Sequence, residues 1–557
     1  MSTPYFITAA LPYANGPLHF GHLAGVYIPA DIYHRHCVLL DRDVVFICGS
    51  DEHGVAIMLG AEAAGQPYQT YVDAHHARHQ ALFAAYNIQC TYYGRTSAPR
   101  HARVAQEFFV ALRDNGALVQ QQTEQPYCNH CQRFVPDRYL GGTCRFCGYT
   151  AARGDECPQC GKWLSFADLQ APYCQTCKGR DIGVRGNTEW ALDLPRFAPQ
   201  LREWLASRPD WKEEIRSYAV SLIDNGLPQR AVTRDLAWGV PVPGEEASGK
   251  KLYVWFEAPI GYLSMLMECC ALRGAPADWR RFWQPDARMI HFIGKDNIIF
   301  HTIVWPAMLL AKGEAVLPAN VPANMFVQFA GRQFSKSAGW YVDAMDALQQ
   351  FGEDRLRYHL INLIPEHSDS DFTWEHFGAK VNGELINNLA NYAHRVLSLV
   401  AKPGVGEITG SDIPRADGER IFEQLRQTSA AVRTLIDQFE LRRALGEILR
   451  LGEQANKFCN DAAPWKLIKH NPPDARPVLA SCLLYLIGIG ALLQPFLPHY
   501  AGLIRSVFPN TDFTALYQGR VGWEVLGDPF VLRPDVSLAI PKVTDDQLRA
   551  QIAKLPA

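Results

Sequence analysis

The segment that most restricts how this chain can fold lies near its start, at residues 5–22. It reads as a short apolar strand, a turn at an Asn-Gly pair, and the first turn of a helix. Pro17 suits the first helical position, because the N–H group that proline lacks has no partner there. His19 and His22 are three residues apart, so they share one face of that turn. A helix start carries unpaired N–H groups and partial positive charge, so two imidazole donors beside it predict a phosphate-binding site.

An HxxH pair has other interpretations when it is taken alone. Two solvated histidines or a metal-binding pair have the same spacing. Gly21 favours ligand binding, because a glycine between the two histidines lets a ligand come close to the backbone. The strand, the turn, the proline and the glycine together are far more specific than the histidine pair.

A second apolar strand, residues 43–48, ends in a polar turn flanked by glycines. Asp51 lies in that turn. The carboxyl ends of strands in open parallel sheets are where ligands bind, so we expect Asp51 to contact a ligand. A helix cap is the alternative role for an aspartate at this position.

A chain of 557 residues is too long for a single ordinary core, so we expect several domains. The net charge of −3 neither indicates nor excludes a nucleic acid partner, because recognition depends on local patches. The N-terminus lacks the build of a signal peptide. The longest uncharged apolar run, residues 478–493, is shorter than the ~18 residues of a membrane-span candidate. We therefore expect a buried helix there, no membrane partner and a cytoplasmic location.

Fifteen cysteines without a secretion signal indicate a reducing compartment and metal-bound thiolates instead of disulfides. Eight of them form four CxxC pairs, each of which supplies two corners of a tetrahedral zinc site. Two sites of four cysteines are therefore possible, and such closed sites are structural because no position is left for water. The spacing does not decide which pairs share an ion. The pairs are Cys128/Cys131, Cys144/Cys147, Cys157/Cys160 and Cys174/Cys177.

Strand patterns that end in polar turns lie on both sides of this cysteine-rich insert. After the insert, residues 252–262 read as a strand running into a Pro-Gly turn, and residues 289–297 as a strand ending near Asp296. Before it, residues 56–115 carry helical patterning. The simplest architecture is an α/β fold, a Rossmann-type doubly wound parallel sheet with a zinc-knuckle insertion and a ligand crevice at its strand ends.

The last third of the chain, from about residue 377, is helical by pattern, with breaks at 402–418 and 471–477. We expect an α-helical bundle there. Just before it, residues 331–339 form a glycine-bounded loop around Lys336. Such a loop can bring a cation onto a developing phosphate charge, although a Lys-Ser pair in a loop is common by itself.

These elements, in this order, resemble the class I aminoacyl-tRNA synthetases. His19-Phe20-Gly21-His22 is similar to the HIGH signature of that class, and Ser335-Lys336-Ser337 is similar to the end of its KMSKS signature. The stretch Leu11-Pro12-Tyr13-Ala14-Asn15-Gly16 resembles the methionyl-tRNA synthetases in particular. The resemblance runs from residue 5 to about residue 550 and implies that the helical bundle binds the anticodon.

The resemblance implies six segments and a monomer, because no appended domain of the kind through which some members dimerise is recognisable. The segments are the first half of the Rossmann catalytic domain (1–115), a connective insertion with zinc knuckles (116–235), the second half of the catalytic domain (236–325), the KMSKS-type loop and stem-contact region (326–376), the helical anticodon-binding domain (377–540) and a C-terminal helix (541–557).

The implied reaction is the activation of L-methionine with ATP and its transfer to the 3′ end of methionine-accepting tRNA. Catalysis then falls to His19, His22 and Lys336, with Mg²⁺ accompanying ATP. ATP-binding positions are His19, Gly21, His22, Gly294, Asp296 and Lys336. Methionine-binding positions are Leu11, Tyr13, Asp51, Trp255, Ala258, Pro259, Tyr262, Ile299, Phe300 and His301. Anticodon-binding positions are Asn391, Arg395 and Trp465.

The types of these residues suit the implied ligands. An apolar aromatic cage packs well against a flexible thioether, and a carboxylate suits an α-ammonium group. Splayed RNA bases stack on aromatic rings and bond to Asn or Arg. Members of the family carry one or two zinc ions. In the two-zinc form, which this chain resembles, the inner four cysteines share one ion and the outer four share the other.

The chain departs from the family signature in the lysine loop. Gln333 stands where the first lysine of KMSKS is expected, and Phe334 stands where the methionine is expected. Loss of one cation near a pyrophosphate leaving group predicts slower activation or weaker ATP binding, unless the adjacent Arg332 compensates.

Rival functions fit parts of the pattern. Gln333 keeps open a paralogue that activates an amino acid and transfers it to a non-tRNA acceptor, although such an enzyme would not need anticodon residues. A tRNA-binding protein with a decayed active site is opposed by the intact His19, His22 and Lys336. A bare Rossmann-type nucleotide-binding enzyme explains neither the cysteine-rich insert nor the helical last third.

Overall fold

The computed structural model describes residues 3–135, 137–154, 157–160, 162, 164–244, 249–314, 316–334, 339–527, 532–533 and 536–555. Its centre is a sheet of five strands in the order β14-β13-β1-β2-β3. Every neighbouring pair in it is parallel. The strands are β1 (Tyr5–Ala9), β2 (Val44–Ser50), β3 (Tyr92–Arg95), β13 (Arg288–Gly294) and β14 (Ala323–Asn324).

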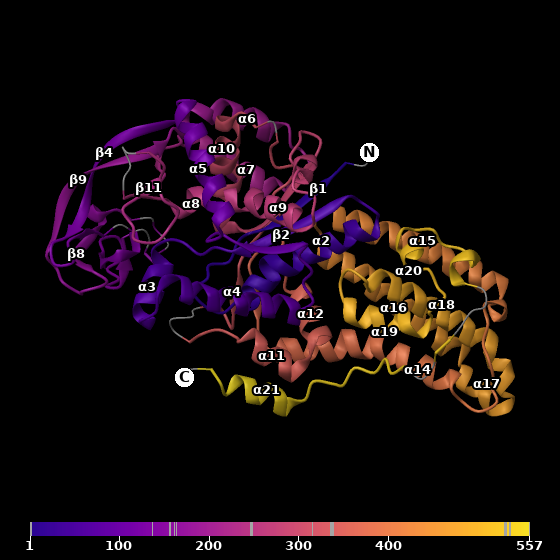
Figure 1. Ribbon diagram of the computed structural model, residues 1–557. Helices are drawn as coiled ribbons and strands as arrows, with labels where there is room; N and C mark the ends of the chain where they lie inside the picture. The colour runs from indigo at the N-terminus through magenta and orange to yellow at the C-terminus, as the bar shows by residue number, and fades with distance from the viewer. Residues whose placement is uncertain are drawn as a thin grey trace.

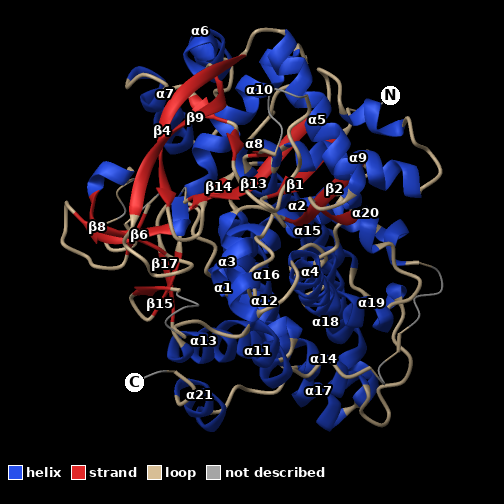
Figure 2. Ribbon diagram, turned by 60° about the vertical axis from the view of Figure 1, so that its left-hand side comes forward, coloured by secondary structure: helices blue, strands red, loops and turns tan. Residues whose placement is uncertain are grey.

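The strand order reverses between β1 and β13, so the doubly wound sheet predicted from the sequence is confirmed. Helices cover both faces, which is why the middle strands are apolar and almost wholly buried. Helices α5 (Pro99–Asp114), α9 (Ile260–Leu272) and α10 (Trp305–Lys312) lie on one side of the strands, and α2 (Ile28–Leu39) lies on the other (Figure 2).

The cysteine-rich insertion extends from the sheet as a long antiparallel pair of strands. β4 (Leu118–Cys128) pairs with β9 (Ile182–Leu192) over their whole lengths, from Leu118 opposite Leu192 to Cys128 opposite Ile182. Beyond this pair lies a small sheet of β7 (Ala152–Arg153), β6 (Leu140–Cys144) and β8 (Leu169–Cys174). Figure 1 shows this end of the insertion on the side of the molecule opposite the helical C-terminal part.

The last third of the described chain is helical, as the sequence predicts. Its core helix, α18 (Arg476–Leu493), is buried along nearly its whole length among neighbouring helices. The surrounding helices are α13 (Trp374–Lys380), α14 (Asn391–Val400), α15 (Arg415–Asp437), α16 (Leu441–Ala462), α17 (Pro464–His470), α19 (Pro498–Val507) and α20 (Phe513–Tyr517). The C-terminal α21 (Asp545–Ile552) packs against α13.

One stretch of the described chain, Pro472–Leu493, is long and apolar enough to cross a membrane by length and composition. It contains α18, and 83% of its most apolar window is buried inside the protein. A core helix has the same composition, so this burial confirms the prediction of a buried helix at residues 478–493.

A buried ion pair ties the catalytic sheet to the helices after it. Arg357, on α12 (Glu353–Asn362), binds the carboxylate of Asp31 on α2, and neither side chain is exposed. The same guanidinium donates to the backbone carbonyls of Tyr86 and Phe496, at 3.0 and 2.6 Å. A buried guanidinium needs this many partners to offset its lost hydration.

The first helix starts later than the sequence predicts. Pro17 does not lie in a helix, because α1 begins at Phe20 (Phe20–His22) and His19 caps it. The imidazole of His19 accepts a hydrogen bond from the backbone N–H of Gly21, so it takes the role that Ser or Asp has at most helix starts.

Two other local predictions are also wrong. Residues 252–262 do not form one strand. β12 (Lys251–Leu252) ends at once, and α8 (Val254–Glu257) and α9 follow, since a short apolar run fits a buried helix as well as a strand. The helical prediction for residues 56–115 missed β3, whose four residues are too few to show a period of two.

Candidate active site

A cavity of about 330 Å³ opens at the carboxyl ends of β1, β2 and β13, where the strand order reverses. Residues after each of these strands contribute to its walls, together with residues after β14 and on the hairpin that follows. This hairpin consists of β15 (Val327–Phe329) and β16 (Arg332–Gln333). The cavity therefore occupies the place where sheets of this topology bind their ligands.

Two histidines of the α1 turn line one side of the cavity, and backbone groups fix both rings. Nδ1 of His19 accepts from the N–H of Gly21 at 3.2 Å, and Nδ1 of His22 accepts from the N–H of His19 at 3.1 Å. In a neutral ring of this kind the proton is on Nε2, which is a donor. The two ring centroids are 3.8 Å apart, so both donors lie in one small patch of the wall. Donors this close together can bind the oxygens of a single anion.

Gly21 has a steric reason to be glycine. A Cβ atom at this position would lie 3.0 Å from the ring of His19, so a larger residue would displace the imidazole. Gly294 is constrained in a similar way, because a Cβ atom there would lie 2.7 Å from a carboxylate oxygen of Asp296. Both glycines and Asp296 line the cavity. Burial raises the pKa of Asp296.

Asp51 lies at the end of β2, buried and beside the cavity, as the sequence predicts. Its backbone N–H donates to the carbonyl of Pro12 at 2.8 Å, and its carbonyl accepts from the N–H of Ala14 at 2.8 Å. One carboxylate oxygen, Oδ1, has no hydrogen-bond partner in the described chain. Burial raises the pKa of Asp51 well above its ordinary value, and the nearby carboxylate of Glu257 raises it further. A ligand ammonium group would supply the missing partner.

Aromatic rings form another wall of the cavity. Trp255 stacks on Phe300 with centroids 4.0 Å apart and planes inclined by 14°, and Tyr13 meets Trp255 edge-on at 6.1 Å. Rings stacked in this way offer a rigid apolar surface, which suits a thioether or another flexible apolar chain.

Two polar side chains that also line the cavity, those of Tyr262 and His301, are hydrogen-bonded to each other. His301 donates from Nδ1 to the carbonyl of Asn297 at 3.0 Å, so its Nε2 accepts from the Tyr262 hydroxyl at 2.8 Å. Burial lowers the pKa of His301 to about 4, which keeps the ring neutral at physiological pH.

The structure brings together most residues that the sequence assigned to this region. Of the ten predicted methionine-binding positions, all line the cavity except Ile299, which packs against the apolar core beside it. Of the predicted ATP-binding and catalytic positions, Lys336 lies outside the described residues and the others line the cavity.

Several residues that line the cavity had no role assigned from the sequence. Met325, Phe326 and Val327 follow β14, so the rule that ligands bind at strand ends could have found them. Ala10, Pro12, Gly25, Val26, Tyr27 and Asn297 carried no comparable signal. Gln333 and Phe334 stand at signature positions of the lysine loop, and these positions could have indicated that they line the cavity.

Gln333, which replaces the first lysine of the loop signature, lines the cavity with its neighbour Phe334. Arg332 does not line it. The Arg332 guanidinium lies 4.9 Å from the ring centroid of Trp340.

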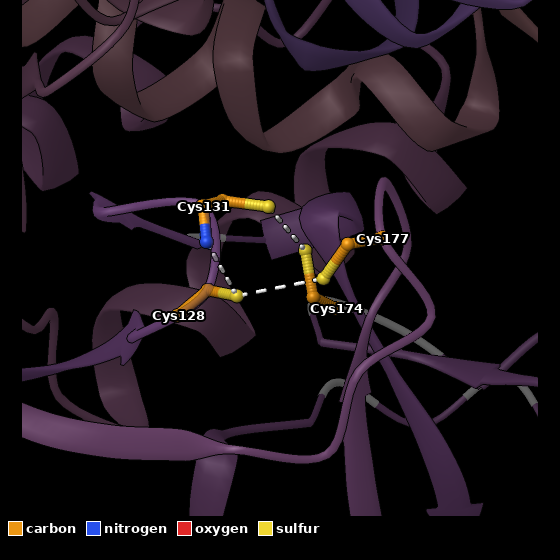
Figure 3. Close-up of side chains that lie close together, drawn as sticks. All are labelled: Cys128, Cys131, Cys174 and Cys177. Atoms are coloured by element: carbon orange, nitrogen blue, oxygen red, sulfur yellow. Dashed lines mark hydrogen bonds between the residues drawn. The ribbon is translucent and has the colours of Figure 1, made fainter.

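The eight cysteines form two clusters, each with its four sulfur atoms within 4.8 Å of one another. In the outer cluster, shown in Figure 3, the Sγ atoms of Cys128 and Cys177 are 3.7 Å apart and those of Cys131 and Cys174 are 3.9 Å apart. The inner cluster is formed by Cys144, Cys147, Cys157 and Cys160.

These clusters could each hold a metal ion. Four thiolates at ~2.3 Å around a tetrahedral zinc ion lie about 3.8 Å from one another, close to the separations seen here. The N–H groups of Cys131 and Gly179 also point at sulfur atoms, each at 3.4 Å, as they do toward metal-bound thiolates. The grouping is the nested one that the resemblance implies.

The three predicted anticodon-binding residues lie on α14 and α17, at the end of the helical part far from the central sheet (Figure 1). The Arg395 guanidinium lies 6.0 Å from the ring centroid of Trp465 and donates to Asn460 and Asn456 at 2.8 and 3.0 Å. Asn391 is on the same helix as Arg395 and donates to Asn387 at 3.3 Å. Arg395 and the indole therefore form one contiguous group with Asn391 on a neighbouring turn.

Comparison with known proteins identifies the class. A family model described as tRNA synthetases class I (M) matches residues 5–397, so the chain belongs to the class I tRNA synthetases. Residues 409–554 match the anticodon binding domain of methionyl tRNA ligase. Within the class, the chain belongs to the methionyl-tRNA ligase family.

Individual relatives agree with this assignment. The methionine–tRNA ligase of Salinibacter ruber is 39% identical over 578 residues, which cover 99% of this chain and 80% of the relative. That of Rubrobacter xylanophilus is 40% identical over 522 residues, covering 91% and 90%. Methionyl-tRNA synthetase of Mycobacterium tuberculosis, solved in complex with methionyl-adenylate, matches 97% of this chain with a TM-score of 0.78 and 26% identity.

Proposed function

We propose that this protein is an ATP-dependent methionine–tRNA ligase. It joins methionine to AMP and then transfers the methionyl group to the 3′ end of a methionine-accepting tRNA. The proposal depends most on one cavity, which combines the unpartnered carboxylate oxygen of Asp51, the aromatic wall at Trp255 and the imidazole donors of His19 and His22. These are the groups that an α-ammonium, a thioether and a phosphate require.

In the first step, a carboxylate oxygen of methionine attacks the α-phosphorus of ATP, and the bond to the pyrophosphate breaks. Asp51 holds the ammonium group and the aromatic wall holds the side chain, which leaves the methionine carboxylate as the mobile reactive end. His19 and His22 donate from Nε2 to phosphate oxygens, where negative charge builds up. Orientation of the reactants and stabilisation of the developing charge then accelerate the reaction, and no covalent enzyme intermediate forms.

In the second step, a ribose hydroxyl of the terminal tRNA adenosine attacks the methionyl carbonyl carbon, and AMP leaves. Arg395 and Trp465 suit an anticodon, because splayed bases stack on an indole and bond to a guanidinium. A rival enzyme that transfers to a non-tRNA acceptor would not need this group.

Two kinds of metal ion belong to the proposal. Asp296 and the phosphates of ATP are oxygen donors of the kind that Mg²⁺ prefers, and that ion would neutralise charge on the pyrophosphate. The two cysteine clusters would each hold one structural Zn²⁺, which fixes the folded shape of the insertion. The monomeric state and the cytoplasmic location stay predictions from the sequence.

The test is charging of total tRNA with each labelled amino acid, run beside amino-acid-dependent ATP–pyrophosphate exchange. We expect exchange with methionine alone and methionine on tRNA. Exchange without charging would support the paralogue with another acceptor. Absence of both reactions would support a binding protein with an inactive site.

A further inference from the structure

A buried carboxylate that does not line the cavity joins two segments that do. Glu257, the last residue of α8, has no exposed surface. Its Oε1 accepts from Nδ1 of His53 at 2.8 Å, and its Oε2 accepts from Nε2 of His101. His101 is bonded in turn through Nδ1 to the Ser264 hydroxyl at 2.9 Å. The carboxylate is therefore held between two imidazole rings.

The partners of Glu257 come from the other side of the cysteine-rich insertion. His53 follows β2, two residues after Asp51, and His101 is on α5. Glu257 itself comes after the insertion, two residues beyond Trp255. Asp51, the expected partner of the methionine ammonium group, and Trp255 thus belong to chain segments about 200 residues apart. The hydrogen bond from His53 to Glu257 spans 204 residues.

The negative charge of Glu257 strengthens its hydrogen bonds to the two imidazole rings. Burial by itself would raise the pKa of Glu257, but the two imidazoles lower it to about 2, so the group is ionised at physiological pH. An ionised carboxylate accepts from both rings at once, and charge-assisted hydrogen bonds are about twice as strong as neutral ones. A glutamine would place an NH₂ group against one of the imidazole N–H donors.

We propose that Glu257 is a positioning residue for the amino-acid pocket. By binding His53 and His101 together, its carboxylate sets the distance between Asp51 and the Trp255 wall. The inference rests on the proposed function, because it assigns Asp51 and Trp255 to methionine. His22 lies on another element, α1, and His19 caps that helix, so the phosphate side of the cavity does not depend on this link.

Two substitutions of Glu257 and one matched control test the inference. Glu257→Gln keeps the shape and removes the charge. Glu257→Asp keeps the charge, but a side chain one methylene shorter cannot reach both rings. The control is Glu268→Gln. Glu268, on α9, is likewise joined to α5, through Arg100, but its ion pair is partly exposed.

The expected result is a split between the two substrates. For Glu257→Gln the methionine KM in pyrophosphate exchange and the methionine Kd from calorimetry should both rise at least about tenfold, since displacements of ~1 Å at a site have effects of this size or larger. The ATP KM should change less than about twofold. Glu257→Asp should lie between Glu257→Gln and the wild type, and Glu268→Gln should match the wild type within about twofold.

Equal rises in the methionine and ATP constants would overturn the inference, because they would indicate general damage. Methionine binding by Glu257→Gln within twofold of the wild type would overturn it as well. If Glu257→Gln does not fold in a thermal melt, the same split in Glu257→Asp decides. A wild-type protein without exchange for any amino acid would instead contradict the proposed function itself.

Discussion

The imidazole of His19 stacks on the ring of Phe334, with centroids 4.5 Å apart and planes inclined by 6°. Phe334 stacks in turn on Phe329 of β15 at 5.7 Å. A Cβ atom at Gly21 would lie 3.4 Å from the Phe334 ring, so the ring also covers the turn between the two histidines. The start of the lysine loop is thereby packed directly on the histidine turn.

We therefore predict that Phe334→Leu slows methionyl-adenylate formation about 2- to 10-fold, since a stacked aromatic pair contributes ~0.5–1.5 kcal/mol beyond its buried area. The methionine KM should stay unchanged, because Phe334 is not part of the wall at Trp255. Single-turnover kinetics would measure the rate. Phe334→Tyr keeps the stack and is the control, and a wild-type rate for Phe334→Leu would show that the stack does not position His19.

The unpartnered oxygen of Asp51 predicts a trade-off between stability and activity. Because the pKa of Asp51 is raised in the folded protein, its ionised form opposes folding at pH values above that pKa. Asp51→Asn should stabilise the protein by about 1–3 kcal/mol at neutral pH and abolish methionine binding. The gain should shrink as the pH falls below the folded pKa, where wild-type Asp51 becomes protonated, and should vanish near the ordinary pKa of a free aspartate.

Denaturant unfolding at several pH values would measure this effect. The matched control has the opposite sign. The neighbouring His36 and the Arg42 guanidinium, which donates to both carboxylate oxygens, overcome the effect of burial and hold the pKa of Asp437 below its ordinary value, so Asp437→Asn should destabilise the protein at neutral pH. Loss of stability in Asp51→Asn would refute the claim that the ionised carboxylate of Asp51 destabilises the folded protein.

Trp465 should matter for tRNA and not for adenylation. Stacking of a base on an aromatic ring contributes ~1–3 kcal/mol, so Trp465→Ala should lower kcat/KM for tRNA charging about 5- to 150-fold. Pyrophosphate exchange without tRNA should be unchanged, because α17 is far from the central sheet (Figure 1), and the cavity lies at the ends of that sheet's strands. Trp523→Ala removes another partly exposed indole, which packs on Phe422, and should leave charging unchanged. Equal loss in both reactions for Trp465→Ala would contradict the assignment.

Each cysteine cluster should hold its own zinc ion. Cys157→Ser should lower the zinc content from two ions per chain to one, since three thiolates and a hydroxyl bind the ion more weakly. Elemental analysis would measure the content, and limited proteolysis would locate the loosened region in residues 140–174. Cys269→Ser, in the apolar core, is the control and should keep both ions. Unchanged zinc in Cys157→Ser would refute two independent sites.

Much of the site could be predicted from the sequence because its signals are local. The turn that holds His19 and His22 is set within four residues, and the position of Asp51 follows from the end of one apolar strand. The two cysteines of each pair are likewise only three residues apart, so their ability to bind metal is visible without a fold. These features depend on short-range geometry, which the order of residues specifies directly.

The helix starting at Val254 shows where local signals fail. An apolar run of this length has no clear period, and the packing of the following helix α9 against α5 and β3 is a long-range contact that the run itself does not show. The prediction that the helix starts at Pro17 is wrong for a related reason, because the imidazole of His19 caps α1 and so fixes where that helix begins.

The sequence by itself determined the class of fold, the family and many of the residues that line the cavity, because these follow from short patterns in a fixed order. Only the tertiary structure decided which distant groups meet. It joined Glu257 to His53 across the insertion, laid Phe334 on His19, and grouped the outer cysteines around a gap of 43 residues between Cys131 and Cys174. Such contacts depend on the packing of whole elements, and no spacing along the chain encodes them.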